Sequence, residues 1–245
     1  MHARTCEAGE AIEWLAHEFG IANIDSGETS KAHQPQSGLV RSRPKQASEP
    51  RAADPELYAW LVDEAGLSSA ARAYLEGRCL SPATVQHFRL RGTDDPRTLL
   101  NQALEEFGEQ RLAKAGFYPR SRRTGKRYVL WWEACILIPF YSRDRVLNYI
   151  QARFLRPKEG RKYVGLEGVA KPLFNANVLP SLKANDEILV LEGAMDAIAA
   201  YEIGLPAVGV LGARSRFKRK WAEQLAQFRV TVIPDRDRAG LEFKD

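Results

Sequence analysis

The sequence predicts an α/β fold, in which a mixed α+β N-terminal subdomain precedes a parallel sheet. Three observations predict it. Apolar residues recur at helical spacing through residues 57–119, and short apolar runs separated by turn residues follow from Tyr128. From Asn185 onward, strand-like runs alternate with helical runs. This β-α-β-α-β order is typical of neighbouring parallel strands.

The composition is that of an ordinary globular protein. The 245 residues are 44% hydrophobic and 27% charged, with a formal net charge of +5. No apolar run approaches the roughly 20 residues that cross a bilayer, and the first residues lack the apolar core of a signal peptide. A cytoplasmic protein without a membrane partner is therefore expected. The net positive charge by itself only weakly favours a polyanionic partner.

Two segments are expected before the folded body. Residues 10–19 have the spacing of a short amphipathic helix, so residues 1–24 are predicted to carry an isolated helix. Residues 25–56 are rich in Ser, Pro, Gln, Lys and Arg, with only Leu39 and Val40 as large aliphatic residues. Such a stretch buries too little apolar surface to offset its ordering entropy, so a flexible linker is predicted.

The body is predicted to divide into residues 57–184 and 185–245. The first part has four helical stretches and then the strand-like runs "ACILIPFYS", "RVLNYIQARFL" and "KYVGL", with a hairpin turn at "SRDR". The second part has strands at "EILVLEG", "PAVGVLG" and "RVTVI", with helices at "AMDAIAAYEIG", "RFKRKWAEQLAQF" and "DRAGLEFKD". This order predicts a Rossmann-like parallel sheet.

Cysteine and histidine patterns do not predict a metal or disulfide framework. The three cysteines, Cys6, Cys79 and Cys135, are far apart and odd in number, and the four histidines are scattered. Partly buried thiols in a reducing compartment are expected, and zinc is not expected.

Acidic residues follow two of the three strands predicted in the second part. Glu192 closes the first strand and Asp196 follows one helical turn later, whereas Asp235 and Asp237 follow the third strand. Ligands of open parallel sheets bind beyond the carboxyl ends of the strands. Side chains at i and i+2 of an extended chain point the same way, about 6–7 Å apart, so these carboxylates can converge. Oxygen ligands favour Mg²⁺ or Mn²⁺.

The two aspartates have an alternative role as turn formers that pair with Arg236 and Arg238. An Asp-x-Asp after a strand is common and by itself only weakly indicates a metal site. The paired pattern, strand-Glu-Gly-x-x-Asp and then strand-x-Asp-x-Asp-x-Ala-Gly some 40 residues later, is much rarer. The paired pattern therefore favours metal ligands.

A basic cluster begins the second helix of this part. It comprises Arg214, Arg216, Lys218, Arg219 and Lys220. Cations at a helix start oppose the helix macrodipole and weaken the helix slightly. Two roles stay open for Arg214 and Lys218, either a solvated face or a phosphate-binding surface that offsets this repulsion.

These motifs resemble a known family. "VLEGAMDAIAAYEIGLPAVGVLGA" followed by "VTVIPDRDRAG" resembles the Toprim domain of primases, topoisomerases and related nucleases. The segments "ILIPFYSRDRVLNYIQARFL" and "KYVGLEGVAKPLFNANVL" are similar to the part that precedes Toprim in DnaG-type primases. "AYLEGRCLSPATVQHFRL" resembles the helical entry of the same catalytic core. The resemblance extends from about Leu57 to the last residue.

The resemblance implies a function and site residues. A primase-type enzyme would use Mg²⁺ or Mn²⁺ to synthesise short RNA primers from ribonucleoside triphosphates on single-stranded DNA for replication. The implied catalytic and metal-binding acids are Glu192, Asp235 and Asp237, with Asp196 supporting the site. Basic residues at positions that contact template or nucleotide phosphates are Arg153, Lys162 and Lys171. A silent single-strand-binding or partner-docking module and a Toprim nuclease are the alternatives.

Two departures from the family pattern affect the expected partners. The zinc ribbon is missing, although residues 1–24 are similar to the end of a primase zinc-binding domain. The sequence also stops at Asp245, before the family's further acidic position, so an incomplete Toprim domain is expected. A fragment, a reduced phage or mobile-element protein, or one part of a split enzyme would fit. A replicative helicase or a separate zinc-ribbon protein would be a partner.

Overall fold

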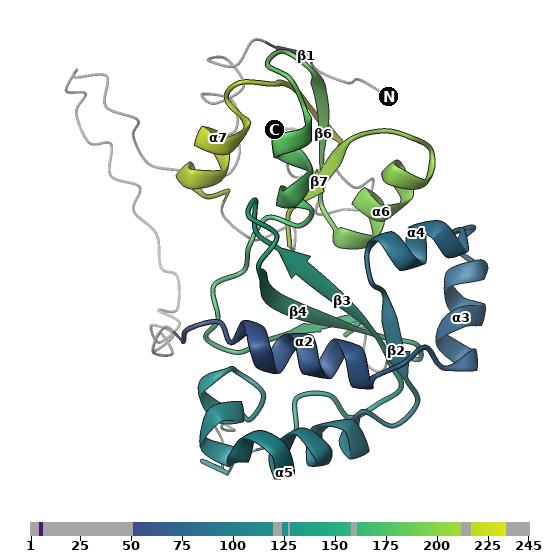
Figure 1. Cartoon of the computed structure of the whole chain (residues 1–245), viewed down its shortest axis with the longest axis vertical. Helices are drawn as coiled ribbons and strands as arrows, with labels where there is room; N and C mark the ends of the chain where they lie inside the picture. Colours follow the sequence, from purple (N-terminus) through teal and green to yellow (C-terminus); the bar gives the residue numbers. More distant parts are fainter. Residues whose placement is uncertain are drawn as a thin grey trace, which may run out of the picture.

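The protein contains two four-stranded sheets, one antiparallel and one mainly parallel, with helices packed around them (Figure 1). This computed structural model describes residues 5–6, 51–119, 124–126, 128–157, 161–211 and 217–233. The mixed α/β fold class predicted from the sequence is confirmed. Within the described ranges, no helix is long and apolar enough to cross a bilayer.

Four helices form in the predicted helical region. They are α2 (Pro55–Glu64), α3 (Ser69–Glu76), α4 (Pro82–His87) and α5 (Pro96–Lys114). Each starts after an Asp or Ser whose side chain accepts backbone N–H groups of the first turn, which satisfies donors that the helix itself leaves over. A proline at the start of α2, α4 and α5 presets the helical φ angle.

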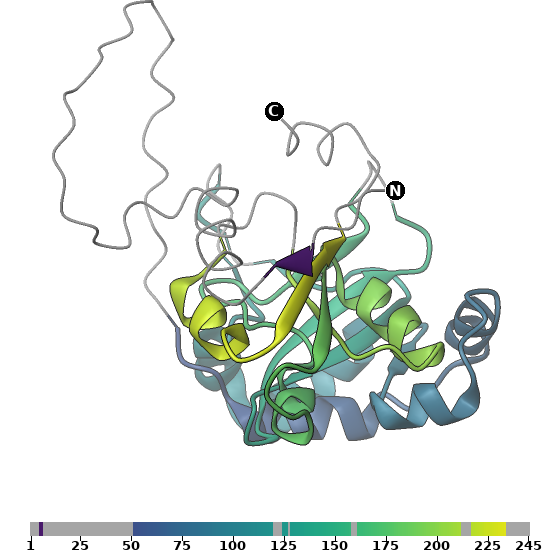
Figure 2. The same ribbon diagram turned by 90° about the horizontal axis from the view of Figure 1, so that it is seen from above.

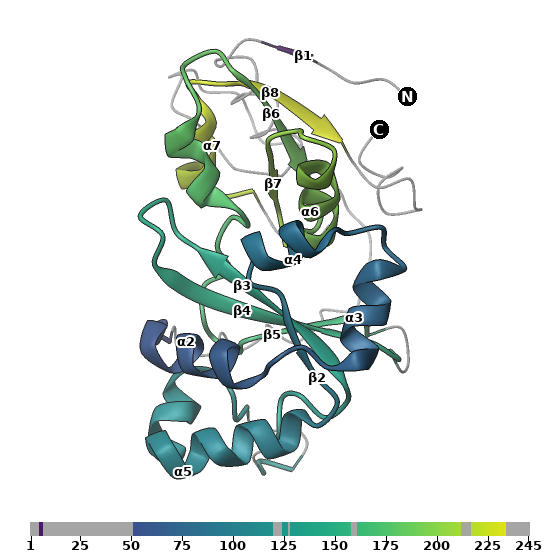
Figure 3. The same ribbon diagram turned by 45° about the vertical axis from the view of Figure 1, so that its right-hand side comes forward.

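The antiparallel sheet has the strand order β2-β3-β4-β5 (Figure 3). Its strands are β2 (Arg91–Thr93), β3 (Cys135–Tyr141), β4 (Leu147–Phe154) and β5 (Tyr163–Gly165). The predicted hairpin turn joins β3 to β4, because the Ser142 carbonyl accepts the Arg145 N–H at 2.9 Å and the Val146 carbonyl accepts the Ser142 N–H at 2.9 Å. Helix α2 packs on β4.

Strand β2 lies where only helices were expected. Its central residue, Gly92, packs so closely on α3 that a Cβ atom there would lie 2.3 Å from the Ala71 Cβ. Three residues are too few to show an alternating pattern, so the sequence does not reveal this strand.

The second sheet has the order β1-β8-β6-β7. Its elements are β6 (Glu187–Leu191), α6 (Ala194–Glu202), β7 (Ala207–Gly209), α7 (Arg219–Leu225) and β8 (Arg229–Ile233). Strand β6 pairs in parallel with both β7 and β8, which confirms the predicted β-α-β-α-β unit. A short 3-10 helix, η1 (Ala176–Ser181), precedes it. The helix predicted after β8 lies outside the described residues.

A short N-terminal strand, β1 (Thr5–Cys6), runs antiparallel along the outer edge of β8 (Figure 2). The rest of the predicted helix of residues 1–24, and residues 25–50 of the predicted linker, lie outside the described residues. The sequence does not predict this pairing, because two residues are too few to show a strand pattern.

The predicted linker ends earlier than residue 56. The Arg51 N–H donates to the Gly168 carbonyl at 2.9 Å, and Asp54 caps α2 by accepting the Leu57 N–H at 3.1 Å. The correction has a physical reason. Asp54 looks like a linker residue by composition, but its carboxylate is bound by an arginine far along the chain.

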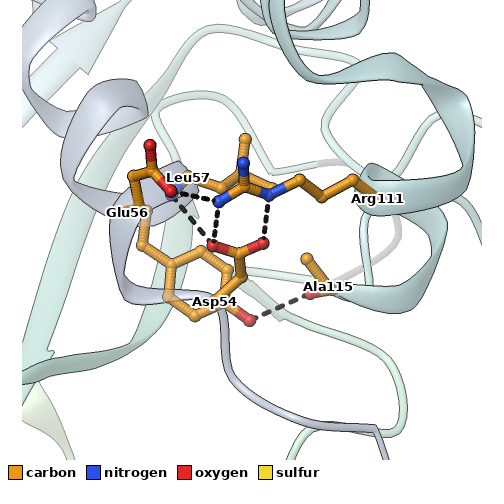
Figure 4. Close-up of polar contacts among 6 residues, drawn as sticks. Asp54, Glu56, Leu57, Arg111 and Ala115 are labelled. Carbon is orange, nitrogen blue, oxygen red and sulfur yellow. Dashed lines mark hydrogen bonds and ion pairs between the residues drawn. The ribbon is translucent and has the colours of Figure 1, made fainter.

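That arginine is Arg111 of α5 (Figure 4). Its Nε and NH2 atoms donate to the two oxygens of Asp54 at 2.6 and 2.9 Å, and NH2 also binds Glu56 at 2.7 Å. The Tyr58 hydroxyl donates to the Ala115 carbonyl at 3.0 Å beside this pair. Bidentate binding of a carboxylate by arginine fixes direction as well as distance, so α2 and α5 are held in register.

The two sheets meet at a seam formed by α4 and α6. The Glu202 carboxylate accepts the Ser81 N–H at 2.9 Å and the Ser81 hydroxyl at 3.1 Å. The His87 ring stacks on Tyr201 with centroids 4.3 Å apart. A hydrophobic cluster passes through the seam, since it includes both β3 residues and α6 residues such as Ile198.

Candidate active site

The acidic residues lie where two parallel strands end. Leu191, the last residue of β6, is in register with Ile233, the last residue of β8, so both strands end at the same edge of the sheet. Glu192 follows β6 at this edge and is half-buried. Asp235 and Asp237 lie outside the described residues, so their approach to Glu192 stays a prediction.

Two glycines allow tight packing beside Glu192. Gly193 begins α6, and a Cβ atom on it would lie 2.6 Å from Oδ2 of Asp196. A Cβ atom on Gly209, at the end of β7, would lie 2.7 Å from the Gly193 carbonyl oxygen. The Asp196 carboxylate is exposed in the first turn of α6, where the helix macrodipole stabilises an anion. The structure therefore brings Glu192 and Asp196 to one edge.

The donor set at this edge suits a hard divalent cation. Both described acids offer only carboxylate oxygens, which Mg²⁺ and Mn²⁺ prefer. Within the described ranges, no three His, Cys, Asp or Glu side chains lie close enough together to hold a metal ion. Since two of the four predicted ligands fall outside those ranges, the complete metal site stays a prediction.

Arg153 lies on β4 between two aromatic rings. Its Cζ is 4.3 Å from the ring centroid of Tyr74 and 5.6 Å from that of Tyr163. Tyr163 faces Arg153 because the two residues are in register across β4 and β5. The side chain is buried, with 9% of the residue exposed, and its NH1 donates to the Phe154 carbonyl at 2.7 Å. Arg153 is therefore a fixed cation rather than a mobile surface arginine.

A second arginine, Arg78, joins the cluster around Arg153 through Tyr74. The Arg78 Nε donates to the Tyr74 hydroxyl at 2.9 Å, and this hydrogen bond, with smaller attractions that include Asp196, raises the pKa of Arg78. Burial raises the pKa of Tyr163, and the negative charge of Asp196 acts in the same direction. The positive charges of Arg153 and Arg78 act in the opposite direction and lower it.

Two of the other predicted basic residues, Lys171 and Lys218, form a second group. Lys218 donates from its ammonium group to the Lys171 carbonyl, and its Nζ lies 4.7 Å from the ring centroid of Trp221. Burial, together with the charges of Lys220 and Lys171, lowers the pKa of Lys218. Lys162 is exposed just before β5, next to Tyr163. Arg214 lies outside the described residues.

Tyr74, Arg78 and Tyr163 contact this cluster but were not among the residues that the sequence predicts for the site. Tyr74 lies on α3, and Arg78 follows four residues later, just past the end of the helix. This spacing is the sequence signal for the contact between the two side chains. Their contact with Arg153 depends on how α3 packs against β4 and β5, which no local pattern shows.

Comparisons with known proteins place the chain in a family. Residues 189–245 match the family model described as Toprim-like. The gene 57 protein of Mycobacterium phage D29 is 31% identical over 116 residues, which cover 46% of this chain and 74% of that protein. A DNA primase of Listeria innocua is 26% identical over 200 residues, which cover 76% of this chain and 31% of that protein.

A solved structure shows the same fold. A DnaG primase catalytic domain bound to single-stranded DNA superposes with a TM-score of 0.61 at 22% identity, covering 78% of this chain and 63% of that one. The chain spans less than a third of the length of the Listeria innocua primase, since the match covers 31% of that protein. It belongs to the same family as the gene 57 protein of phage D29, and it has the fold of a DnaG-type primase catalytic core with a Toprim domain.

Proposed function

We propose that the chain is a metal-dependent nucleotidyltransferase that joins ribonucleotides into short RNA primers on single-stranded DNA. The observation that carries this proposal is Arg153, a buried cation held by two tyrosine rings, in a fold that also gathers Glu192 and Asp196 where β6 ends. A polymerase site needs anions for metal ions and cations for phosphates. The acidic edge would supply the anions, and the Arg153 cluster would supply the cations.

The basic and acidic residues would have different roles in phosphoryl transfer. Catalysis of this reaction is mostly positioning and stabilisation of negative charge, rather than covalent chemistry by the protein. Arg153 and the exposed Lys162 would hold template or nucleotide phosphates. Lys171 and Lys218 would add a second group of contacts, and Arg214 precedes Lys218 by four residues in the sequence. Each phosphate contact adds to an affinity that falls as salt rises.

Mg²⁺ or Mn²⁺ fits the acidic edge. Glu192, Asp235 and Asp237 would hold it, and Asp196 would support them from the first turn of α6. When bound, the ion would neutralise charge that develops on the phosphate oxygens. The protein residues would orient the primer end and the incoming nucleotide against this edge. A replicative helicase or a separate zinc-ribbon protein is proposed as a further partner.

Template-dependent synthesis of labelled RNA by the purified chain tests the proposal. The reaction contains single-stranded DNA, the four ribonucleoside triphosphates and Mg²⁺ or Mn²⁺. We expect Glu192→Gln, which removes one negative charge with little change in shape, to lower the rate about a hundredfold or more. Asp235→Asn and Asp237→Asn should do the same. Glu106→Gln, on the exposed face of α5, is the matched control and should leave the rate unchanged.

The outcomes separate the alternatives. Synthesis that survives the three substitutions contradicts the metal assignment. Salt-sensitive DNA binding without any synthesis, unchanged by these substitutions and by chelation, indicates the silent binding module. Metal-dependent nicking of plasmid DNA without synthesis indicates the nuclease.

A further inference from the structure

The environment of Arg153 poses a physical problem. Only 9% of the residue is exposed, its NH1 binds the Phe154 carbonyl, and its Nε has no hydrogen-bond partner among the described residues. Over the same part of the chain, no carboxylate lies within ion-pair distance of Arg153. Burying a cation without a counter-charge is costly, so another interaction must stabilise this guanidinium.

Aromatic rings supply that interaction. The Arg153 Cζ lies 4.3 Å from the Tyr74 ring centroid, closer than its 5.6 Å to the Tyr163 ring. The face of an aromatic ring attracts a cation through its quadrupole and carries no net charge. A carboxylate in the same place would cancel the positive charge of Arg153. Tyr74 therefore orients the cation and leaves its charge available for a polyanion.

Tyr74 also has a second contact that a leucine or phenylalanine could not make. Its hydroxyl accepts the Arg78 Nε–H at 2.9 Å. One side chain of α3 thus contacts Arg153 of the antiparallel sheet and Arg78, which lies just past the end of α3. Neither Tyr74 nor Arg78 was among the predicted site residues.

We infer that Tyr74 and Arg78 are positioning residues of the site: Tyr74 holds Arg153 in a fixed orientation for a phosphate, and its hydroxyl holds Arg78 beside the same ring. The ring and the hydroxyl have separable roles. The ring orients Arg153 at 4.3 Å and lies farther, at 5.8 Å, from the Arg78 Cζ, whereas the hydroxyl hydrogen-bonds Arg78 alone. The phosphate-binding part of this inference rests on the proposed function, whereas the positioning part does not.

Two substitutions at one residue separate the roles. Tyr74→Phe keeps the ring and removes the hydroxyl, and Tyr74→Leu removes both while keeping an apolar side chain of moderate size. Tyr128→Leu is the matched control, since Tyr128 is an exposed tyrosine outside this cluster. Thermal unfolding of each variant establishes that the protein is folded at the assay temperature.

The first measurement does not depend on activity. In protein labelled with ¹⁵N-arginine, the Nε–H signal of Arg153 is assigned by its loss in Arg153→Lys. A proton near the face of a ring is shifted by the ring current, so Tyr74→Leu should move this signal and Tyr74→Phe should move it little. Tyr74→Phe should instead move the Nε–H signal of Arg78. If Tyr74→Leu leaves the Arg153 signal in place, the inference is wrong, whatever the activity of the protein.

The second measurement is the affinity for fluorescent single-stranded DNA as a function of salt. We expect Tyr74→Leu to weaken binding roughly tenfold, as the loss of a partly desolvated cation–π contact permits. Tyr74→Leu in an Arg153→Ala background should weaken it no further, because the ring acts through Arg153. Equal weakening in both backgrounds would indicate a structural role and would overturn the phosphate-binding part.

Failure of the proposed function has a different signature. If the wild-type chain binds no DNA and synthesises no RNA while the Arg153 signal still moves in Tyr74→Leu, the proposed function and the phosphate-binding role are both wrong, and the positioning of Arg153 stands. If binding is present and Tyr74→Leu leaves it unchanged, only the role of Tyr74 in binding is wrong.

Discussion

Asp54 should stabilise the fold through two separable interactions, a helix cap and an ion pair (Figure 4). The carboxylate accepts the Leu57 N–H at 3.1 Å and two N–H groups of Arg111 at 2.6 and 2.9 Å. Losing an N-cap costs about 1 kcal/mol. The bidentate pair is worth about 1–2 kcal/mol, a modest value because the Arg111 side chain is 36% exposed and the Asp54 side chain 20% exposed.

Two variants divide this free energy. Asp54→Ala removes both interactions and should lower the free energy of unfolding by about 2–3 kcal/mol. Asp54→Asn keeps an oxygen that can accept the Leu57 N–H and should lower it by about 1–2 kcal/mol. Glu223→Gln is the control, because it breaks the Arg219–Glu223 ion pair of 3.1 Å between highly exposed side chains on α7. Such i,i+4 pairs contribute only about 0.3–0.5 kcal/mol.

Acid should abolish the difference between wild type and Asp54→Asn. The hydrogen bonds from Arg111, above all, hold the pKa of Asp54 below its ordinary value. A carboxylate with a lowered folded-state pKa stabilises the protein above its unfolded-state pKa of about 3.9, and this contribution is lost as pH falls through the folded-state pKa. Urea unfolding followed by tryptophan fluorescence at neutral and acidic pH measures both effects. Equal stability of Asp54→Ala, Asp54→Asn and Glu223→Gln at neutral pH would refute this reasoning.

Two further predictions concern the second sheet and the thiols. Gly209→Ala should lower the free energy of unfolding by about 1–3 kcal/mol, because the new Cβ would meet the Gly193 carbonyl oxygen at 2.7 Å and backbone atoms cannot move aside easily. Urea unfolding measures this, and unchanged stability would contradict the close packing beside Glu192. Cys79 should react with a thiol reagent at neutral pH faster than Cys135, because Cys79 is exposed and burial raises the pKa of Cys135 to about 12. If the Cys79→Ser substitution removed the slow phase of the thiol reaction and kept the fast phase, this prediction would be contradicted.

Much of the fold could be predicted because its signals are local. Each strand of the parallel unit is a short apolar run, and a glycine follows or ends the strand at Gly193 and Gly209. Strand β2 was missed because its pairing with β3 involves residues some 40 positions later, such as Leu137 opposite Arg91. Contacts at that separation leave no mark on a three-residue segment.

The site was predictable only where one segment carries the pattern. Glu192 and Asp196 share one strand–helix turn, so their positions at the end of β6 and in the first turn of α6 follow from their spacing. The role of Asp54 could not be predicted from a local pattern, because it depends on Arg111, which is 57 residues away. The role of Tyr74 likewise depends on Arg153 of another element. The role of a side chain that depends on a partner far along the chain cannot be predicted from composition or periodicity.

The seam between the sheets restricts how this protein can change. Ser81 and Glu202 belong to different parts of the chain, as do the stacked His87 and Tyr201. A Toprim unit transplanted from a distant relative would bring its own version of α6 and would leave α4 facing unmatched side chains. Recombination within this family should therefore succeed when α4 and α6 are inherited together, and hybrids that divide the two should misassemble.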